Sequence, residues 1–480
     1  MRLFCVYCGN QPFAMFMKKL LSAFTLLVCC VALGQNVYIP DAAFKAKLLS
    51  YGTLIDTNGD GEIQITEAQS FQGILNVNGA PSNYGTITNL TGIEYFTEIT
   101  ALYAVYNHIT SLNLSQNTKL TLVNVDHNDI AYFNVDNGAL IQTLRISNNQ
   151  ISSLNLSNCT VLTELECNSN LLSLLDLSAN TLLTNVACRA NLLTSININN
   201  CPELLTLYIN YNQLTAIDVS HNPLLTILYC DSNSLTALDV TANLELTDIS
   251  CASNNLTQLD ITHNLHLYSL FCFYNNLLAL DLSASQELVL LSCGHNPNLT
   301  ELDFSHTPAF KHLNCLELPV TELDFSLCPE LNLLVCSGCP QLKYINLKNG
   351  NNSDAIAPNM YIADLPSLET VCVDDEDSYF ANLLYEQFIT DVDVTDICAL
   401  STNSIAFGKV VFSPNPVSNT LYITGSTISE VRLYNSIGQT VGFYKNQAQI
   451  DFSGFSNGMY LVHAKDSNGA VTIKSIVKGL

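Results

Sequence analysis

The chain has 480 residues, of which 17 are Lys or Arg and 42 are Asp or Glu, so its formal net charge is −25. This charge argues against binding to nucleic acid, because phosphates need a basic face. It suits instead a surface that attracts cations or basic partners.

The first 34 residues predict a secretory signal peptide. Met17-Lys18-Lys19 precede the apolar run Leu20–Leu33, and Ala32-Leu33-Gly34 fits the small-residue rule for cleavage. The mature chain is then expected to start at Gln35, with residues 1–16 an over-extended start. The apolar run is too short to span a bilayer, and no other segment is long and apolar enough. We therefore expect no transmembrane segment in the mature chain.

The next segment predicts a calcium loop of the EF-hand kind. Residues 56–67 read DTNGDGEIQITE and match DxNxDGxIxxxE at every constrained position, between helices expected to begin at Pro40-Asp41 and at Thr66. Side-chain oxygens, one main-chain carbonyl and a final two-oxygen acid would surround the ion. The expected ligands of one structural Ca²⁺ are Asp56, Asn58, Asp60, Glu62 and Glu67. The alternative is a metal-free polar loop between the same helices.

A repeat of 21 residues covers the middle of the chain. Its form is LxxLxCxxNxLxxLDLSxN, and asparagine keeps one position at 107, 128, 149, 170, 191, 212, 233, 254, 275 and 296. A fixed period of roughly 20–29 residues with this signature marks a leucine-rich-repeat solenoid, whose units stack because none can bury its apolar side alone. Leu318 and Cys339 continue the asparagine position, which makes about twelve rungs.

Each rung is expected to supply two short parallel strands on opposite walls, because both halves alternate apolar and polar residues. The first-half strands, such as Leu102–Ala104, Leu207–Ile209 and Leu270–Cys272, should form one parallel sheet. The buried asparagines should bond the turn backbone and stack into a ladder. From Ile99 to Val373 the chain resembles the 21-residue nested class of bacterial leucine-rich repeats.

Most of the 18 cysteines follow the repeat. Eight share one inward position: Cys167, Cys188, Cys230, Cys251, Cys272, Cys293, Cys315 and Cys336. A second position holds Cys159, Cys201 and Cys328. Side chains that point in parallel from strands about 4.8 Å apart do not close a disulfide easily, so we expect free, buried thiols. Cys372 and Cys398 lie outside the register, and for them both a disulfide and free thiols remain open.

Outward strand positions are the candidate binding surface. Aromatic residues concentrate at Tyr208, Tyr211, Tyr229, Phe271, Phe273 and Tyr274. Exposed aromatics on a rigid sheet suit recognition of a protein or a sugar, whereas stacked aromatics can also simply stabilise the sheet. On the other wall aspartate recurs at 176, 218, 239, 260, 281, 303 and 324, held there either by hydrogen bonds of the turn, which we favour, or by cations.

The last part of the chain changes character. Repeats stop, and short alternating strands appear between turn residues, with the landmarks Ser413-Pro414-Asn415-Pro416-Val417, Ile437-Gly438-Gln439 and Gly458-Met459-Tyr460-Leu461-Val462. From Val410 to Leu480 the chain resembles the type A sorting domain of type IX secretion in the Bacteroidetes. This resemblance implies a β-sandwich recognised by the outer-membrane type IX export machinery, and often removed after export. An ordinary immunoglobulin-like module is the alternative.

The predicted fold is mainly β: a leucine-rich-repeat solenoid with a small helical cap and an immunoglobulin-like β-sandwich. The predicted domains are 1–34 (start extension and signal peptide), 35–72 (calcium-binding cap), 73–373 (solenoid), 374–409 (cap and linker) and 410–480 (sorting domain). No constellation of catalytic residues stands out, so we expect no enzyme. The hypothesis is a secreted or cell-surface protein that binds a protein or a glycan. The rivals are an enzyme with a carboxylate site and a purely structural, calcium-stiffened envelope protein.

Overall fold

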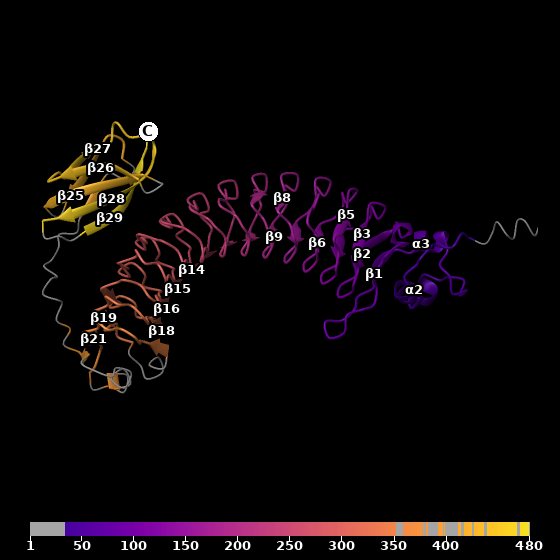
Figure 1. Cartoon of the computed structure of the whole chain (residues 1–480), viewed down its shortest axis with the longest axis horizontal. Coiled ribbons are helices and arrows are strands. Elements are labelled where there is room, and N and C mark those ends of the chain that lie inside the picture. Colours follow the sequence, from indigo (N-terminus) through magenta and orange to yellow (C-terminus); the bar gives the residue numbers. More distant parts are fainter. Residues whose placement is uncertain are drawn as a thin grey trace, which may run out of the picture. The chain divides into compact units, whose positions relative to one another are not determined.

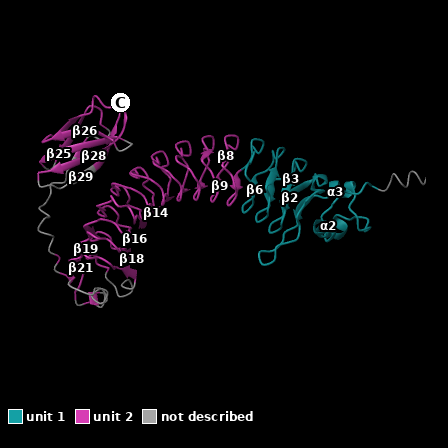
Figure 2. Ribbon diagram, in the orientation of Figure 1, with its two compact units in different colours: residues 1–162 teal, residues 163–480 magenta. Residues whose placement is uncertain are grey.

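The computed structural model describes residues 34–351, 359–376, 378, 381–382, 392–396, 398, 411–413, 417–424, 427–435, 439–467 and 471–479. It divides into two compact units, residues 1–162 and 163–480, which are described one at a time (Figure 1 and Figure 2). Residues 1–33 of the predicted signal peptide lie outside the described residues. No described helix has the length and apolar character needed to cross a membrane.

The first unit opens with a small helical cap. Helix α2 (Ala42–Leu49) begins where the Asp41 side chain accepts the N–H of Phe44 at 2.9 Å, as an N-cap residue should. The helix buries Phe44 and Leu48 completely, which supplies the apolar face expected from the sequence. The second carboxylate oxygen of Asp41 accepts the N–H of Thr88 at 2.7 Å. The cap is therefore tied to the segment that leads into the first rung.

The loop that follows α2 leads through the 3₁₀ turn η1 (Gly52–Leu54) to the short helix α3 (Ile65–Ser70). This helix begins one residue before Thr66, the predicted start. The reason is a capping box, in which the Gln64 side chain and the Glu67 side chain satisfy each other's backbone N–H groups. The predicted loop between two helices is thus present in the fold.

The rungs of the first unit form a parallel sheet. Its strands, in order, are β1 (Gly73–Asn76), β2 (Ile99–Tyr103), β4 (Leu122–Asn124) and β6 (Thr143–Arg145), with the 3₁₀ turn η2 (Ile93–Tyr95) before β2. The other wall carries the parallel pair β3 (Ser111–Asn113) and β5 (Tyr132–Asn134). Each strand buries its middle residue inside the coil and directs its neighbours outward, which is the alternation predicted from the sequence.

The second unit continues the same pattern. Its main sheet contains β7 (Glu164–Glu166), β9 (Asn185–Ala187), β11 (Thr206–Tyr208), β12 (Ile227–Tyr229), β13 (Asp248–Ser250), β14 (Ser269–Phe271), β15 (Leu290–Ser292), β16 (His312–Asn314), β18 (Leu333–Val335) and β20 (Met360–Tyr361), all parallel. These strands start one residue earlier than predicted, because the N–H of Thr206 and its equivalents already bond the preceding rung. Neighbouring strands are offset by one repeat, so residues 21 positions apart lie side by side through most of the sheet.

The second wall is less regular than predicted. Strands occur there as β8 (Leu174–Asp176) with β10 (Ser195–Asn197), and as β17 (Glu322–Asp324), β19 (Tyr344–Asn346), β21 (Thr370–Cys372) and β22 (Asp393–Thr395). Residues 216–218, 237–239, 258–260 and 279–281 form no strand. In these rungs, the hydrogen bonds to the neighbouring rung are made by residues that precede this wall in the sequence. For example, the Gln213 N–H donates to the Leu193 carbonyl at 2.9 Å. A strand needs successive bonds along one stretch, which these rungs do not make.

The repeated asparagines form the predicted ladder. In one rung, the Nδ2 of Asn254 donates to the carbonyls of Cys230 at 3.1 Å and Cys251 at 3.0 Å. Its Oδ1 accepts the N–H of Leu235 at 2.9 Å. One buried side chain thus satisfies backbone groups of its own rung and of the rung before it. The same bonds recur at Asn275, which explains why asparagine keeps this position.

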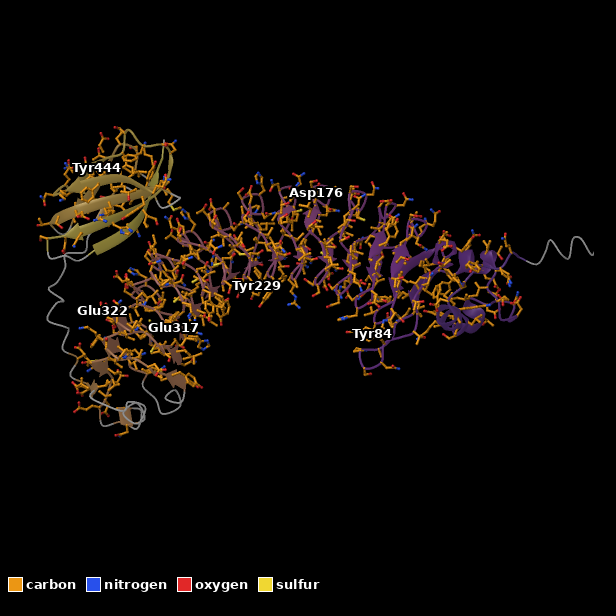
Figure 3. The ribbon with its side chains drawn as sticks, viewed as in Figure 1. Tyr84, Asp176, Tyr229, Glu317, Glu322 and Tyr444 are labelled. Atoms are coloured by element: carbon orange, nitrogen blue, oxygen red, sulfur yellow. A yellow bond between two sulfur atoms is a disulfide. The ribbon has the colours of Figure 1, made fainter. Side chains whose placement is uncertain are left out.

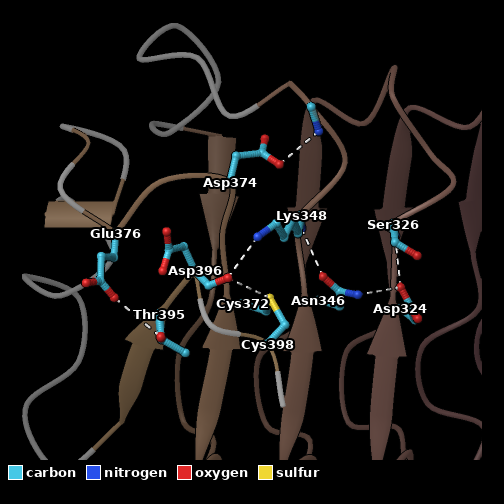
Figure 4. The surroundings of a disulfide bond; sticks show 11 residues. Asp324, Ser326, Asn346, Lys348, Cys372, Asp374, Glu376, Thr395, Asp396 and Cys398 are labelled. Carbon is cyan, nitrogen blue, oxygen red and sulfur yellow. Dashed lines mark hydrogen bonds between the residues drawn. A yellow bond between two sulfur atoms is a disulfide. The ribbon is translucent and has the colours of Figure 1, made fainter. Parts of the chain in front are cut away.

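A disulfide between Cys372 and Cys398 closes the far end of the solenoid (Figure 4). Their Cα atoms lie 5.6 Å apart, within the range that a disulfide spans. Close to it, the Lys348 ammonium donates to the carbonyl of Asp396 at 2.8 Å. The question left open by the sequence is answered in favour of the disulfide.

The C-terminal residues form two antiparallel sheets around one core. The first sheet contains β23 (Val411–Ser413), β24 (Thr420–Thr424) and β27 (Gln449–Asp451), and the second β26 (Thr440–Lys445), β25 (Ile428–Asn435), β28 (Gly458–Asp466) and β29 (Val471–Lys478). Leu421 and Ile450 of one sheet share a buried cluster with Val431 and Val462 of the other. This is the β-sandwich that was expected. The landmarks Pro414-Asn415-Pro416 and Ile437-Gly438 lie outside the described residues.

Candidate functional site

The predicted calcium loop is folded around two buried carboxylates. Asp56 is 8% exposed and Glu67 is 5% exposed. One oxygen of Asp56 accepts the N–H of Gly59 at 2.8 Å, and the other accepts the N–H of Gly61 at 3.0 Å. Gly61 has φ +78°, a left-handed conformation that only glycine adopts readily, so the sharp turn at this position depends on it.

Glu67 closes the loop from the other end. Its Oε1 accepts the N–H of Thr57 at 2.8 Å and its Oε2 accepts the N–H of Gln64 at 2.9 Å. Burial alone would raise the pKa of Glu67, but hydrogen bonds from Gln64, Thr57 and Asn58 bring that pKa below its ordinary value. The last predicted ligand is therefore a charged carboxylate, and it faces the same loop as Asp56.

The three intermediate ligands lie on the rim of this loop. The Oδ1 of Asn58 accepts the Asp60 N–H at 2.9 Å, and an oxygen of Asp60 accepts the Glu62 N–H at 2.8 Å. The Glu62 carboxylate pairs with Lys45 at 2.6 Å, and the predicted ligand atom of this residue is its main-chain carbonyl. Within the described residues no three His, Cys, Asp or Glu side chains are arranged as a metal site. The predicted set contains three such side chains, Asp56, Asp60 and Glu67, and the described structure does not bring these three together as a metal site.

The outward aromatic residues lie on the main sheet and its edge. Tyr208 and Tyr229 are neighbours in the register of β11 and β12, and their rings meet edge to face with centroids 5.2 Å apart. The next two positions in that column are Ser250 on β13 and Phe271 on β14. Tyr208, Tyr229 and Phe271 are all partly exposed, so each ring presents surface to solvent.

The other predicted aromatics form a second group. Phe273 and Tyr274 follow β14, with ring centroids 5.8 Å apart. Tyr211 and Tyr274 share a repeat position at which the backbone is left-handed, with φ of 56° and 52°, and they are 60% and 53% exposed. The six predicted residues are thus two clusters, one around Tyr229 and one around Tyr274, with Tyr211 on the same edge as Tyr274 three rungs away.

Sequence reasoning missed some neighbours of these clusters. His295 stacks on Tyr274 with centroids 4.0 Å apart, and in the first unit His127 stacks on Tyr106 at 4.4 Å. All four occupy the left-handed repeat position, so comparing that column at a spacing of 21 residues would have found both pairs.

Two carboxylates beside Tyr229 were missed as well. Asp231 accepts the Ser250 hydroxyl at 2.9 Å, and Asp248 accepts the Thr247 hydroxyl at 2.7 Å and a hydrogen bond from the hydroxyl of Ser269. Burial raises the pKa of Tyr229, and the charges of Asp248, Tyr208 and Asp231 raise it further. Asp231 and Asp248 therefore act electrostatically on the Tyr229 ring. They stand in different columns, so the repeat pattern did not bring them together.

The aspartates of the other wall are explained by their turns. Each accepts the N–H of the residue two positions on, as from Ser220 to Asp218 at 3.0 Å and from Thr241 to Asp239 at 3.0 Å. At Asp176, on the wall opposite Tyr229 (Figure 3), the backbone bond from Ser178 lowers the carboxyl pKa. These bonds confirm the hydrogen-bonded reading of the column.

A hollow of about 450 Å³ lies on the same wall, lined by Glu301, Asp303, Glu322 and Asp324 among others. Burial raises the pKa of Glu301, and the charges of Asp303 and Glu322 raise it further. The enzyme hypothesis expected carboxylates converging from off-register positions. Glu301 and Glu322, like Asp303 and Asp324, are one repeat of 21 residues apart, so these acids belong to the repeat.

Comparison with known proteins identifies the C-terminal part and the fold. Residues 411–478 match the family described as the secretion system C-terminal sorting domain. No curated protein matches the chain. The chain is similar to the functional domain of InlJ from Listeria monocytogenes, which includes a cysteine ladder, with 23% identity, TM-score 0.55, and coverage of 92% of this chain and 98% of that one. It is also similar to the internalin InlF from Listeria monocytogenes, with 19% identity, TM-score 0.51, and coverage of 76% and 98%.

At these identities the two solved structures show the fold alone. They confirm the leucine-rich-repeat solenoid that the 21-residue period predicted. The family match confirms the C-terminal sorting domain, which marks proteins for export by type IX secretion. The chain is thus a leucine-rich-repeat solenoid that carries a type IX sorting domain, and it is directed to secretion or to the outer cell surface.

Proposed function

We propose that this protein is a recognition protein of the cell surface or the extracellular space, and that it binds through the outer face of strands β11 to β14. The observation that supports this most directly is the pair Tyr208–Tyr229, whose partly exposed rings meet at 5.2 Å on a hydrogen-bonded parallel sheet. Aromatic side chains supply large contact area at a low cost in conformational entropy, and they dominate many interfaces.

The sheet also holds this face in one geometry. Leu207 and Leu228, between the outward residues, are completely buried, and the asparagine ladder fixes the turn after each strand. A partner would therefore meet side chains that are already positioned, which lowers the ordering cost of association. We propose a protein ligand first and a glycan second, because aromatic faces suit both.

The enzyme rival has less support. The carboxylates around the hollow at Glu301 are spaced by the repeat, and Asp303 and Asp324 are engaged by the N–H groups of Ser305 and Ser326 at 2.9 Å. Hydroxyl groups do contact imidazoles on this wall, as Ser305 contacts His306 at 2.8 Å. The same contact recurs between Ser220 and His221 at 3.1 Å, so it belongs to the repeat and not to a separate catalytic site. The purely structural rival expects no aromatic patch on this sheet.

The test uses the mature chain, residues 35–480, on arrays of glycans and of secreted and surface proteins. The double variant Tyr208→Ala/Tyr229→Ala should lose at least about tenfold in affinity for any ligand found, since two central aromatic contacts disappear. Tyr132→Ala is the matched control, because Tyr132 is 58% exposed on the other wall of the first unit. A ligand that both variants bind as well as the native chain would place recognition elsewhere.

We also propose that the loop of residues 56–67 binds one Ca²⁺ as a structural clip. The two buried carboxylates, the amide of Asn58 and the carbonyl of Glu62 are all oxygen donors, the kind that Ca²⁺ prefers. With one such loop in the cap, the ion would stabilise the entry to the solenoid. Calcium would attract Asp56, Asp60 and Glu67 together and offset the repulsion among them.

Thermal unfolding with calcium and with a chelator tests this site. Native protein should unfold at a higher temperature with calcium, because the ion binds only the folded loop. Asp56→Asn/Glu67→Gln should abolish the difference. Glu62→Gln is the matched control, since its carboxylate faces Lys45 and its carbonyl is unchanged. A calcium shift that survives in the double variant would exclude this loop.

A further inference from the structure

We infer that the outer face of β11 to β14 recognises a cationic segment of a partner protein, with a lysine or arginine side chain placed on the Tyr229 ring between Asp231 and Asp248. This inference rests on the proposed function and names the chemistry of its ligand. Three observations carry it: the arrangement of the sheet, the charges beside the ring and the absence of lysine and arginine in this part of the sequence.

The sheet brings the components together from three rungs. Tyr229 on β12 has Tyr208 on one side and Ser250 on the other. The Ser250 hydroxyl donates to Asp231, which holds this carboxylate beside β13. Asp248 is paired with Ile227 in the register and stands two residues before Ser250, so its side chain is on the same outward face as Tyr229. One aromatic ring is thus flanked by two acids.

Both carboxylates are engaged only by groups without charge. Asp231 bonds the hydroxyl of Ser250, and Asp248 bonds the hydroxyls of Thr247 and Ser269. Neither pairs with a Lys, Arg or His side chain in the described part of the chain. Burial raises the pKa of Asp231, although the Ser250 hydroxyl lowers it.

The sequence around this face contains no cation of its own. Between Arg189 and Lys311 there is no lysine and no arginine, whereas acids recur through the same stretch, as at Glu203, Glu245 and Glu287. A cation that approaches β12 therefore meets no lysine or arginine from these rungs, and their acids attract it. This charge complementarity selects a basic partner over an acidic or a neutral one.

The chemistry of the face suits an ammonium or guanidinium group. A cation over an aromatic ring is attracted by the negative face of the π system, and the two carboxylates supply acceptors for its N–H groups. A neutral sugar can also donate hydroxyl hydrogen bonds to the two carboxylates and stack on the ring. It leaves their negative charge uncompensated, however, whereas a cationic side chain neutralises it.

The test measures binding of an acetylated hexalysine amide to the mature chain, residues 35–480, by titration calorimetry. The same peptide with every lysine acetylated, and chitohexaose, serve as neutral probes. Asp231→Asn/Asp248→Asn should weaken hexalysine binding at least about tenfold. Asp218→Asn/Asp239→Asn changes the charge equally on the other wall and should weaken binding less than about twofold. Equal weakening by the two double variants would overturn the inference, because only general electrostatic attraction would remain.

The second part of the test substitutes the two tyrosines. Tyr208→Phe/Tyr229→Phe keeps the ring faces and should keep hexalysine binding within about twofold, whereas Tyr208→Ala/Tyr229→Ala should reduce it about tenfold. If a neutral probe binds in a tyrosine-dependent way and hexalysine does not, the inference fails while the proposed function stands. If no probe responds to the alanine variant, the inference fails, and only a tyrosine-dependent ligand from the arrays would keep the proposed function. Thermal unfolding of each variant shows that it is folded.

Discussion

The position of an aspartate in the coil decides whether the pKa of its carboxyl is raised or lowered. Burial raises the pKa of Asp126 to about 6, although the Ser147 N–H and the charge of Arg145 both lower it. On the other wall, Asp218 is exposed, and its pKa is lowered by the hydroxyl and the N–H of Ser220. Burial therefore disfavours the charged form of Asp126, whereas hydrogen bonds of the turn favour the charged form of Asp218.

Asp126→Asn should stabilise the protein at neutral pH. The folded pKa near 6 lies above the unfolded value of about 3.9, so the contribution of this carboxyl is most favourable below pH 4 and is lost as pH rises through 6. We expect the variant to be more stable by about 1–2 kcal/mol at pH 7.5, after allowance for solvent screening, and equal at pH 4. Urea unfolding at the two pH values measures this.

The control for this substitution is Glu203→Gln, which also removes one acid, at an exposed position. It should leave the pH dependence as it is in the native chain. A stability gain for Asp126→Asn that is the same at pH 4 and pH 7.5 would contradict the assignment to this carboxyl.

Asn254→Ala should show what one rung of the ladder contributes. The substitution leaves the Leu235 N–H without a partner in a buried site. It also removes one hydrogen bond each from the carbonyls of Cys230 and Cys251, which keep those from the side chains of Asn233 and Asn275. We expect a loss of about 2–4 kcal/mol and a lower urea midpoint. Asn255→Ala is the control, because that side chain is exposed, and it should cost less than about 0.5 kcal/mol. Similar midpoints for the two variants would mean that the ladder is not what holds the rungs.

Structural elements repeat because a strand, a turn and an inward column recur together. The buried cysteines, which recur at fixed repeat positions, illustrate this. Burial raises the thiol pKa of Cys159, Cys201 and Cys328 to about 11 and that of Cys251 to about 12. Cys339 is the exception, since a hydrogen bond with Cys315 lowers its pKa, but it is just as buried. Thiols of this kind act as small apolar side chains.

The free thiols should therefore be inert in the native protein. Thiol reagents act on accessible thiolates, and all twelve free cysteines among the described residues are buried. Native protein at pH 8 should react with none of them over minutes, and protein unfolded without a reductant should expose twelve. After reduction the number should be fourteen, which is the 18 cysteines of the chain less the four that precede Gln35. Rapid reaction of the native protein with the thiol reagent would disprove the burial of these cysteines.

The whole molecule combines two kinds of β structure, a parallel solenoid and an antiparallel sandwich. The solenoid is parallel and built from one repeated rung, whereas residues 411–478 form antiparallel sheets with their own core and match a sorting domain. Each part buries its apolar residues within itself, as independent domains do. We therefore place the export address in the sandwich and expect the proposed recognition to reside in the solenoid.

Deletion of residues 410–480 should abolish surface delivery without unfolding the rest. The chain that ends at residue 405 keeps all repeats and the Cys372–Cys398 disulfide, so it should unfold cooperatively and retain ligand binding. In a host with type IX secretion it should stay in the periplasm, because it lacks the recognised domain. Surface labelling and circular dichroism measure the two outcomes. Surface delivery of the shortened chain, or its failure to fold, would refute this division.

The sequence by itself determined the solenoid, the buried cysteines, the asparagine ladder and the sorting domain. The reason is periodicity: in a coil of 21 residues per turn, positions 21 apart become neighbours, so a column in the sequence is a column in space. The tertiary structure decided what the period leaves undefined. Asp231 and Asp248 meet around Tyr229 from different columns, and the second wall loses strands in some rungs. The Cys372–Cys398 disulfide lies outside the register altogether. Contacts between columns depend on side-chain direction and local backbone, which no repeat specifies.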